Sequence, residues 1–106
     1  MRVKAEVTTT ARESLVRLLE RRSQRPTDAL LAAILYTEDI TQTLEAHAGP
    51  PPGAKTRQLL DREETWWNYA DNVWVEFKTV DKVLLFGLRS ERVIKVTYFA
   101  EQPGGP

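Results

Sequence analysis

The residues best suited to chemistry lie in the C-terminal third of the chain, where charged side chains are interspersed with apolar ones. Arg89 and Lys95 are candidates for stabilising negative charge on a phosphate group. Glu76 and Lys78 are candidates for proton transfer or for orienting a substrate. Cross-strand ion pairing among the same residues is the alternative interpretation, and each pair would contribute about 0.2–1 kcal/mol. These four residues form the candidate catalytic set.

Four large apolar residues are expected on the same face of a sheet as the catalytic set. They are Trp74, Leu85, Val93 and Phe99. Strand side chains alternate between two faces, and an open face this rich in apolar residues exceeds the scatter normal for a protein surface. We therefore predict that these four residues bind a partner chain, a peptide or a second copy of the protein.

Other combinations of residues that support catalysis are missing from the sequence. With no Cys and one His, the chain can form neither a disulfide nor a thiolate zinc site. A Ser-His-Asp triad would have to use His47, whose place in the last turn of a predicted helix suits the helix dipole instead. We do not expect Gly104 and Gly105 to form a phosphate-binding loop, which requires a helix after the glycines. We predict no cofactor and no bound metal.

The N-terminal part of the chain predicts a strand followed by a helix. Residues 2–7 alternate between apolar and polar side chains, as a half-buried strand does. Thr10 and Glu13 have the spacing of a capping box at a helix start. Ser23 to Pro26 should end this helix. Four apolar residues are predicted on the buried side of this helix: Ala11, Leu15, Leu18 and Leu19. Arg22 lies at the border of the same side.

A second helix is predicted from Thr27, as the N-cap, to about His47. Thr37 to Asp39 could instead mark a kink or a restart of this helix. Residues 50–53 predict an extended connector, and residues 55–64 fit either a helical turn or a loop. The predicted apolar stripe of the helix comprises Leu30, Leu31, Ala33, Ile34, Leu35, Ile40 and Leu44.

The remainder of the chain predicts four short strands joined by tight turns. The strands are expected at 66–70, 73–80, 83–89 and 93–100, with turns at 71–72, 81–82 and 90–92. Such short connections join antiparallel neighbours. Alternation predicts a core-facing set made of Val73, Val75, Phe77, Leu84, Phe86, Leu88, Ile94, Val96 and Tyr98.

These elements predict an α+β fold with two layers, in which a helical hairpin packs on one face of a mostly antiparallel sheet in the order β-α-α-β-β-β-β. The length of 106 residues suits one domain, expected at 1–101, with a disordered tail at 102–106. No apolar run approaches the length of a membrane span, and the N-terminus lacks the apolar core of a signal peptide, so we expect a cytoplasmic protein.

The order of a strand, a helical hairpin and a meander resembles the RelE/ParE superfamily of small bacterial toxins. The C-terminal runs at 83–88 and 92–99 carry the resemblance, which covers nearly the whole chain. It implies a toxin of a type II toxin-antitoxin pair, held inactive by an antitoxin whose helix or extended segment wraps it. RelE-like members cut messenger RNA on the ribosome, and ParE-like members poison DNA gyrase.

The chain departs from the RelE-like pattern in several places. Such nucleases are usually markedly basic, whereas this chain has 15 basic and 15 acidic residues. Residues 100–102 replace a basic ending, apolar Val83 stands where an Arg is expected, and Tyr98 falls by alternation on the core face. Messenger RNA cleavage is therefore either retained by a reduced basic set or lost. The alternative function is a non-catalytic domain that binds other proteins or forms homo-oligomers.

Overall fold

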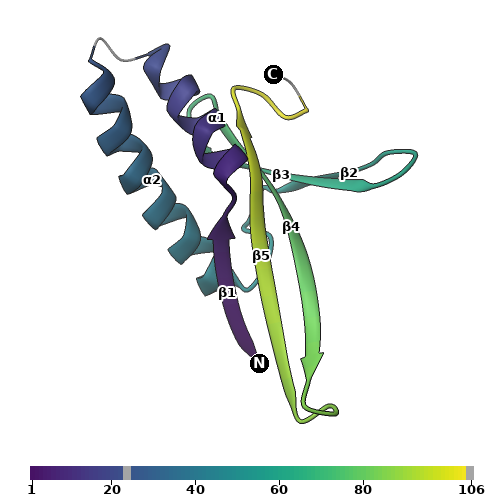
Figure 1. Ribbon diagram of the computed structural model, residues 1–106. Helices are drawn as coiled ribbons and strands as arrows, with labels where there is room; N and C mark the ends of the chain where they lie inside the picture. The colour runs from purple at the N-terminus through teal and green to yellow at the C-terminus, as the bar shows by residue number, and fades with distance from the viewer. Residues whose placement is uncertain (23–24, 105–106) are drawn as a thin grey trace.

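The computed structural model describes residues 1–22 and 25–104, which form two helices and one five-stranded sheet. The sheet order is β1-β5-β4-β3-β2. Both helices lie on one side of the sheet, and β4 and β5 extend as a long hairpin away from them (Figure 1). The elements, in chain order, are β1 (Arg2–Val7), α1 (Thr9–Glu20), α2 (Pro26–His47), β2 (Lys55–Gln58), β3 (Glu63–Ala70), β4 (Val73–Leu84) and β5 (Arg89–Ala100).

The first and last strands pair in parallel at one side of the sheet, and all other pairings are antiparallel. The chain leaves β1 through the two helices and re-enters the sheet at its opposite edge, in β2. Glu45 of α2 accepts a hydrogen bond from the Ala5 backbone N–H of β1 at 3.0 Å. This bond ties the second helix to the edge strand. The α+β fold class is confirmed, with a mixed sheet.

The first helix is capped by Thr8, so the prediction of a cap at Thr10 is wrong. The Ala11 backbone N–H donates to the Thr8 hydroxyl at 3.1 Å. Ala11, Leu15 and the other predicted apolar positions of this helix are buried, as expected. Ser14 is buried beside them, where its hydroxyl donates to the Ala11 carbonyl and accepts from the Phe99 N–H. Ser14 thereby fixes α1 on β5.

The second helix begins at Pro26, one residue before the predicted N-cap Thr27, because proline suits the first helical position. It runs without interruption to His47, so no restart occurs at residues 37–39. Ser23 and Gln24, which belong to the predicted break between the two helices, lie outside the described residues. Within the part of the chain described, neither helix is long and apolar enough to cross a membrane.

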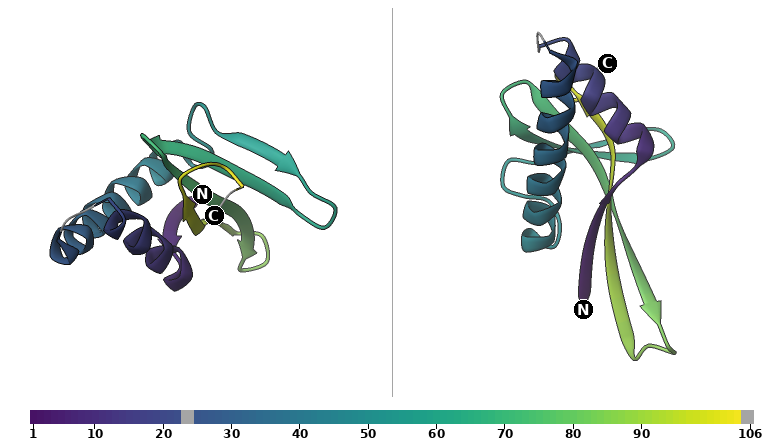
Figure 2. Two further views of the ribbon diagram at one scale, coloured as in Figure 1. Left: turned by 90° about the horizontal axis from the view of Figure 1, so that it is seen from above. Right: turned by 60° about the vertical axis from the view of Figure 1, so that its left-hand side comes forward.

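The predicted apolar stripe of α2 is only partly buried. Ala33, Ile40 and Leu44 are in the core, whereas four larger residues are 52–65% exposed. The reason is visible in Figure 2: α1 lies between the start of α2 and the sheet, so this part of α2 does not pack on the sheet itself. These exposed residues are Leu30, Leu31, Ile34 and Leu35.

The strand predicted at 83–89 does not exist as a separate element. β4 continues through 81–82 to Leu84, β5 starts at Arg89 and includes 90–92, and residues 85–88 form the turn between them. Consequently Phe86, Leu88 and Leu84, predicted in the core, are exposed at the end of the hairpin. The ambiguous segment 55–64 supplies β2 and the start of β3 instead.

A one-residue irregularity in β5 changes which side chains face the helices. Phe77 pairs with Val96, but the preceding Glu76 pairs with Tyr98, so Thr97 is the extra residue of a bulge. Beyond it, Phe99 is 2% exposed and packs in the core, whereas Tyr98 shares a face with Glu76. The predicted faces of Tyr98 and Phe99 are therefore wrong, while Val73, Val75, Phe77, Ile94 and Val96 are core residues as predicted.

Candidate functional site

The face of the sheet opposite the helices, here called the open face, carries most of the candidate catalytic set. Lys78 of β4 lies directly opposite Lys95 of β5, and Glu6 of β1 flanks Lys95 on its other side. Neither lysine forms an ion pair among the residues described. Like charges directly opposite in a sheet are destabilising, and the two ammonium groups together suit a bound anion.

Glu76 is next to this lysine pair, with its carboxylate held by the bulge. The Thr97 hydroxyl lies 2.7 Å from Glu76 Oε1 and 3.2 Å from the Glu76 carbonyl oxygen. A carboxylate that accepts one hydroxyl hydrogen bond keeps other lone pairs for a substrate proton. The alternative interpretation of cross-strand ion pairs is therefore wrong for Glu76, because it bonds a hydroxyl and not a lysine.

Tyr98 is a further candidate residue of this face, and sequence reasoning missed it. It lies opposite Glu76 in the β4–β5 ladder and is half-buried. Strict alternation places it on the core face, and only the bulge at Thr97 moves it to the open face. No local signal in the sequence marks this bulge. The open face thus brings a carboxylate, two ammonium groups and a phenol together.

Glu64 of β3 is a second missed residue, and it is 7% exposed. Its carboxylate accepts hydrogen bonds from Trp66 Nε1 at 3.0 Å, from Arg57 at 3.0 Å and from Arg62 at 3.1 Å. The Trp66 hydrogen bond, followed by the two guanidinium groups, holds the pKa of Glu64 below its usual range. Glu64 is therefore a fixed anion that positions two arginines at the margin of the open face.

A shallow concavity joins these two groups of residues. Its volume is about 230 Å³. The Glu64–Arg62 ion pair lines the same concavity as Glu76 and Lys78. Thr97, the extra residue of the bulge, also lines it. It is lined by Arg62, Glu63, Glu64, Glu76, Phe77, Lys78 and Thr97.

Trp74 also lies on the open face, where the sequence placed it. It pairs with Asn68 of β3 and Ala100 of β5 and is half-buried. The Lys55 ammonium group of β2 lies 5.5 Å from the centre of its ring, within the range of a cation–π contact. Trp74 offers an aromatic surface beside the charged residues of the same face.

The other predicted site residues do not join this cluster. Arg89 lies opposite Leu84 beside the hairpin turn, and it is six residues from Lys95 along β5, or about 20 Å at the usual strand rise. Leu85 is exposed in the turn. Val93 and Phe99 are 5% and 2% exposed, so the predicted partner-binding surface does not exist as a continuous patch.

Comparison of the chain with protein-family models, with curated proteins and with solved structures finds no match.

Proposed function

We propose that this protein is a toxin-family protein of the RelE/ParE type that cleaves messenger RNA on its open face and is controlled by an antitoxin-like partner. The observation that carries the proposal is the bulge at Thr97, which places Tyr98 opposite Glu76 beside the facing Lys78 and Lys95. This arrangement supports the proposal because it adds a phenol to the carboxylate and the two ammonium groups already expected on the open face. The ribosome is the expected setting for the reaction.

The chemistry is phosphoryl transfer within the RNA. Glu76 takes the proton from a ribose 2′-hydroxyl, the 2′ oxygen forms a bond to the adjacent phosphorus, and the bond from phosphorus to the 5′ oxygen breaks. The leaving 5′ oxygen takes a proton from Lys78. Lys95 stabilises the extra negative charge on the phosphate oxygens during the transfer. The products are a 2′,3′-cyclic phosphate and a free 5′-hydroxyl.

The remaining open-face residues supply binding and orientation. The Tyr98 hydroxyl can donate a hydrogen bond to a phosphate oxygen. Trp74 can stack on a base, an interaction worth about 1–3 kcal/mol. Arg57 and Arg62, held by Glu64, add positive charge where the strand of RNA would continue. DNA lacks the 2′-hydroxyl that Glu76 would activate, so the mechanism is specific for RNA.

The test is expression of the chain without a partner gene, with ribosome-bound messenger RNA mapped for cleavage. We expect slowed growth and cleaved messages from the wild type. Glu76→Gln and Lys95→Ala should each reduce cleavage about 10²–10⁴-fold, the usual contribution of a catalytic acid, base or electrostatic group. Lys82→Ala is the matched control, because Lys82 is an exposed lysine of the same hairpin outside the cluster.

Two outcomes would reject the nuclease proposal. One is normal growth with intact cellular RNA at high expression. The other is growth arrest that Glu76→Gln leaves unchanged, which would point to a different target such as gyrase.

A non-catalytic interaction domain is the second candidate function. The exposed apolar side chains of α2 and of the β4–β5 turn favour it, since they exceed the scatter normal for a surface. It predicts intact RNA together with a stable complex in solution.

A further inference from the structure

The end of the β4–β5 hairpin is the most apolar exposed part of the molecule. We call it the hairpin tip, residues 83–88. Phe86 is fully exposed and Leu88 is 85% exposed, although both belong to residue types that usually become buried. The tip lies at the far end of the molecule from the helical hairpin (Figure 1). Its apolar residues are Val83, Leu84, Leu85, Phe86 and Leu88.

The backbone of the tip holds these side chains outward at a cost in strain. Leu85, Phe86 and Gly87 are consecutive residues in the left-handed region, with φ of 53°, 55° and 88°. For a residue with a side chain this conformation costs about 1–2 kcal/mol, and asparagine or glycine would be the usual choice. Strained, exposed apolar residues at the end of an arm indicate a contact made outside the chain.

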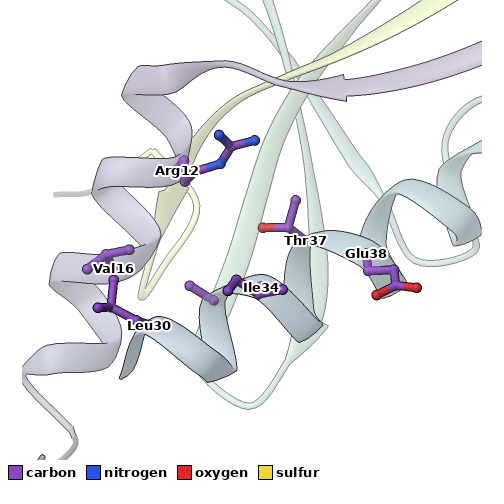
Figure 3. Close-up of a pocket in the computed structure, with 7 residues that line it drawn as sticks. Arg12, Val16, Leu30, Ile34, Thr37 and Glu38 are labelled. Atoms are coloured by element: carbon purple, nitrogen blue, oxygen red, sulfur yellow. The ribbon is translucent and has the colours of Figure 1, made fainter. Parts of the chain in front are cut away.

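The same chain carries an apolar groove that could receive such a tip. The α1–α2 groove, shown in Figure 3, has a volume of about 340 Å³. A cavity of about 150 Å³ is enough for benzene, so a phenyl ring fits it. Val16, Leu30 and Ile34 supply its apolar walls, and Arg12 and Glu38 stand at its rim. Its full lining is Arg12, Val16, Leu30, Ala33, Ile34, Thr37 and Glu38.

We propose that the hairpin tip of one copy seats in the α1–α2 groove of a second copy, with Phe86 as the central side chain. Tip and groove lie at opposite ends of a molecule that measures 52 × 31 × 23 Å, so two antiparallel copies could exchange two equal contacts. If the two contacts cannot both form within one pair of copies, the same tip-to-groove interaction joins successive copies into a longer assembly.

Charge and area both favour a second copy as the occupant. The formal net charge is zero, so two copies do not repel each other overall. The groove rim carries one charge of each sign, Arg12 and Glu38, and the tip is flanked by charges of both signs, with Arg2 and Arg89 beside Glu91, so neither surface repels the other by a single sign of charge. One buried Phe removes about 150–250 Å² from water. Each partner would bury its own tip, with the neighbouring leucines, and its own groove, which brings the contact toward the roughly 800 Å² per partner of a stable complex.

The test is sedimentation of the purified full chain at micromolar concentrations. We expect wild-type dimers or longer assemblies. Phe86→Asp and Ile34→Asp should each weaken self-association about 30-fold or more, as loss of a central interface residue does. Leu60→Asp is the matched control, because Leu60 is a fully exposed leucine in the β2–β3 connection. Circular dichroism verifies that each variant folds.

Mixing the two variants makes the test specific. Phe86→Asp keeps an intact groove and Ile34→Asp keeps an intact tip, so an equimolar mixture should recover association that neither variant shows alone. A wild-type monomer at all concentrations would overturn the proposal. A mixture that stays monomeric would also overturn it. Association of Ile34→Asp alone would indicate tip-to-tip contact, and association of Phe86→Asp alone would indicate groove-to-groove contact. Binding of the tip to lipid vesicles without self-association would equally reject a second copy as the occupant.

Discussion

Among single residues, Glu64 has the most complete set of partners on the open face. Three donors from Trp66, Arg57 and Arg62 surround its carboxylate. The Trp66 hydrogen bond is the largest cause of its lowered pKa, and the two arginines add to it. The Glu64 carboxylate therefore holds the two arginines in place and is not free to accept a proton from a substrate. Glu76 remains the candidate proton acceptor.

This arrangement predicts how stability depends on pH. Because the folded-state pKa of Glu64 lies below its ordinary value of 4.5, its contribution is complete above 4.5 and is lost as pH falls through the folded value. Glu64→Gln should lower the melting temperature at pH 7, and the gap from wild type should shrink below pH 4.5. Thermal unfolding across this pH range measures both effects.

Glu63→Gln is the control for this experiment, since Glu63 is the exposed neighbour of Glu64. It should change the melting temperature much less. A Glu64→Gln deficit that stays constant down to pH 2 would show that lost packing, and not the charge, is responsible.

At the scale of elements, the start of α1 shows how sequence signals compete. Thr8, Thr9 and Thr10 are all acceptable N-caps, and the Glu13 spacing favoured Thr10. The Thr8 N–H bonds the Val96 carbonyl oxygen of β5 at 3.1 Å, so the β1–β5 pairing extends to this residue. The helix therefore begins as soon as the strand ends.

The cap assignment predicts a difference between two similar variants. Thr8→Ala should lower the free energy of unfolding by about 0.5–2 kcal/mol, because the Ala11 N–H loses its acceptor. Thr10→Ala should change it by less than about 0.5 kcal/mol, because Thr10 is exposed inside the first turn. Urea denaturation of both variants measures the two free energies of unfolding. Equal effects would contradict the observed cap.

The β4–β5 hairpin shows the same competition over a longer range. Asp81 and Lys82 are typical of a turn by composition, yet they continue β4, and Asp81 receives two hydrogen bonds from Arg92 across the ladder at 2.7 and 3.0 Å. Arg92 also donates to the Ala48 carbonyl oxygen at the end of α2, at 2.8 Å. These contacts fix the register of β4 and β5 and move the turn to 85–88.

At the scale of the whole molecule, the core is confined to one part of an elongated shape. α1 covers β5 and α2 covers α1 and β1, while the hairpin tip extends beyond all of them (Figures 1 and 2). The result is a core with two exposed apolar regions, the first half of α2 and the hairpin tip. Both would be expected to meet another molecule.

This distribution predicts a strong contrast along α2. Leu44→Ala should lower the free energy of unfolding by about 2–5 kcal/mol, because Leu44 is fully buried. Leu35→Ala should change it by less than about 0.5 kcal/mol, because Leu35 is 65% exposed. Chemical denaturation at low protein concentration, where self-association is minimal, measures the intrinsic fold. A large effect of Leu35→Ala there would contradict the exposure of this side chain in the fold.

The sequence alone was sufficient for the α+β class, for both helices, for β1, and for the core positions of α1 and most of β4 and β5. Periodicity supplied these features, because alternating or 3.6-residue spacing depends only on which neighbours along one element share a face. It also placed Glu76, Lys78 and Lys95 correctly on the open face. The extra residue lies in β5 after Lys95, so alternation is uninterrupted along β4 and along β5 as far as Lys95.

Only the tertiary structure decided the position of the hairpin turn, the faces of Tyr98 and Phe99, the exposure of half the α2 stripe, and the parallel pairing of β1 with β5. Each depends on contacts between segments far apart in the chain. The bulge forms where Thr97 meets Glu76, and the Arg92–Asp81 contact belongs to the β4–β5 register that leaves residues 85–88 for the turn. Because local spacing carries no information about such contacts, one extra residue in a ladder reverses every assignment beyond it.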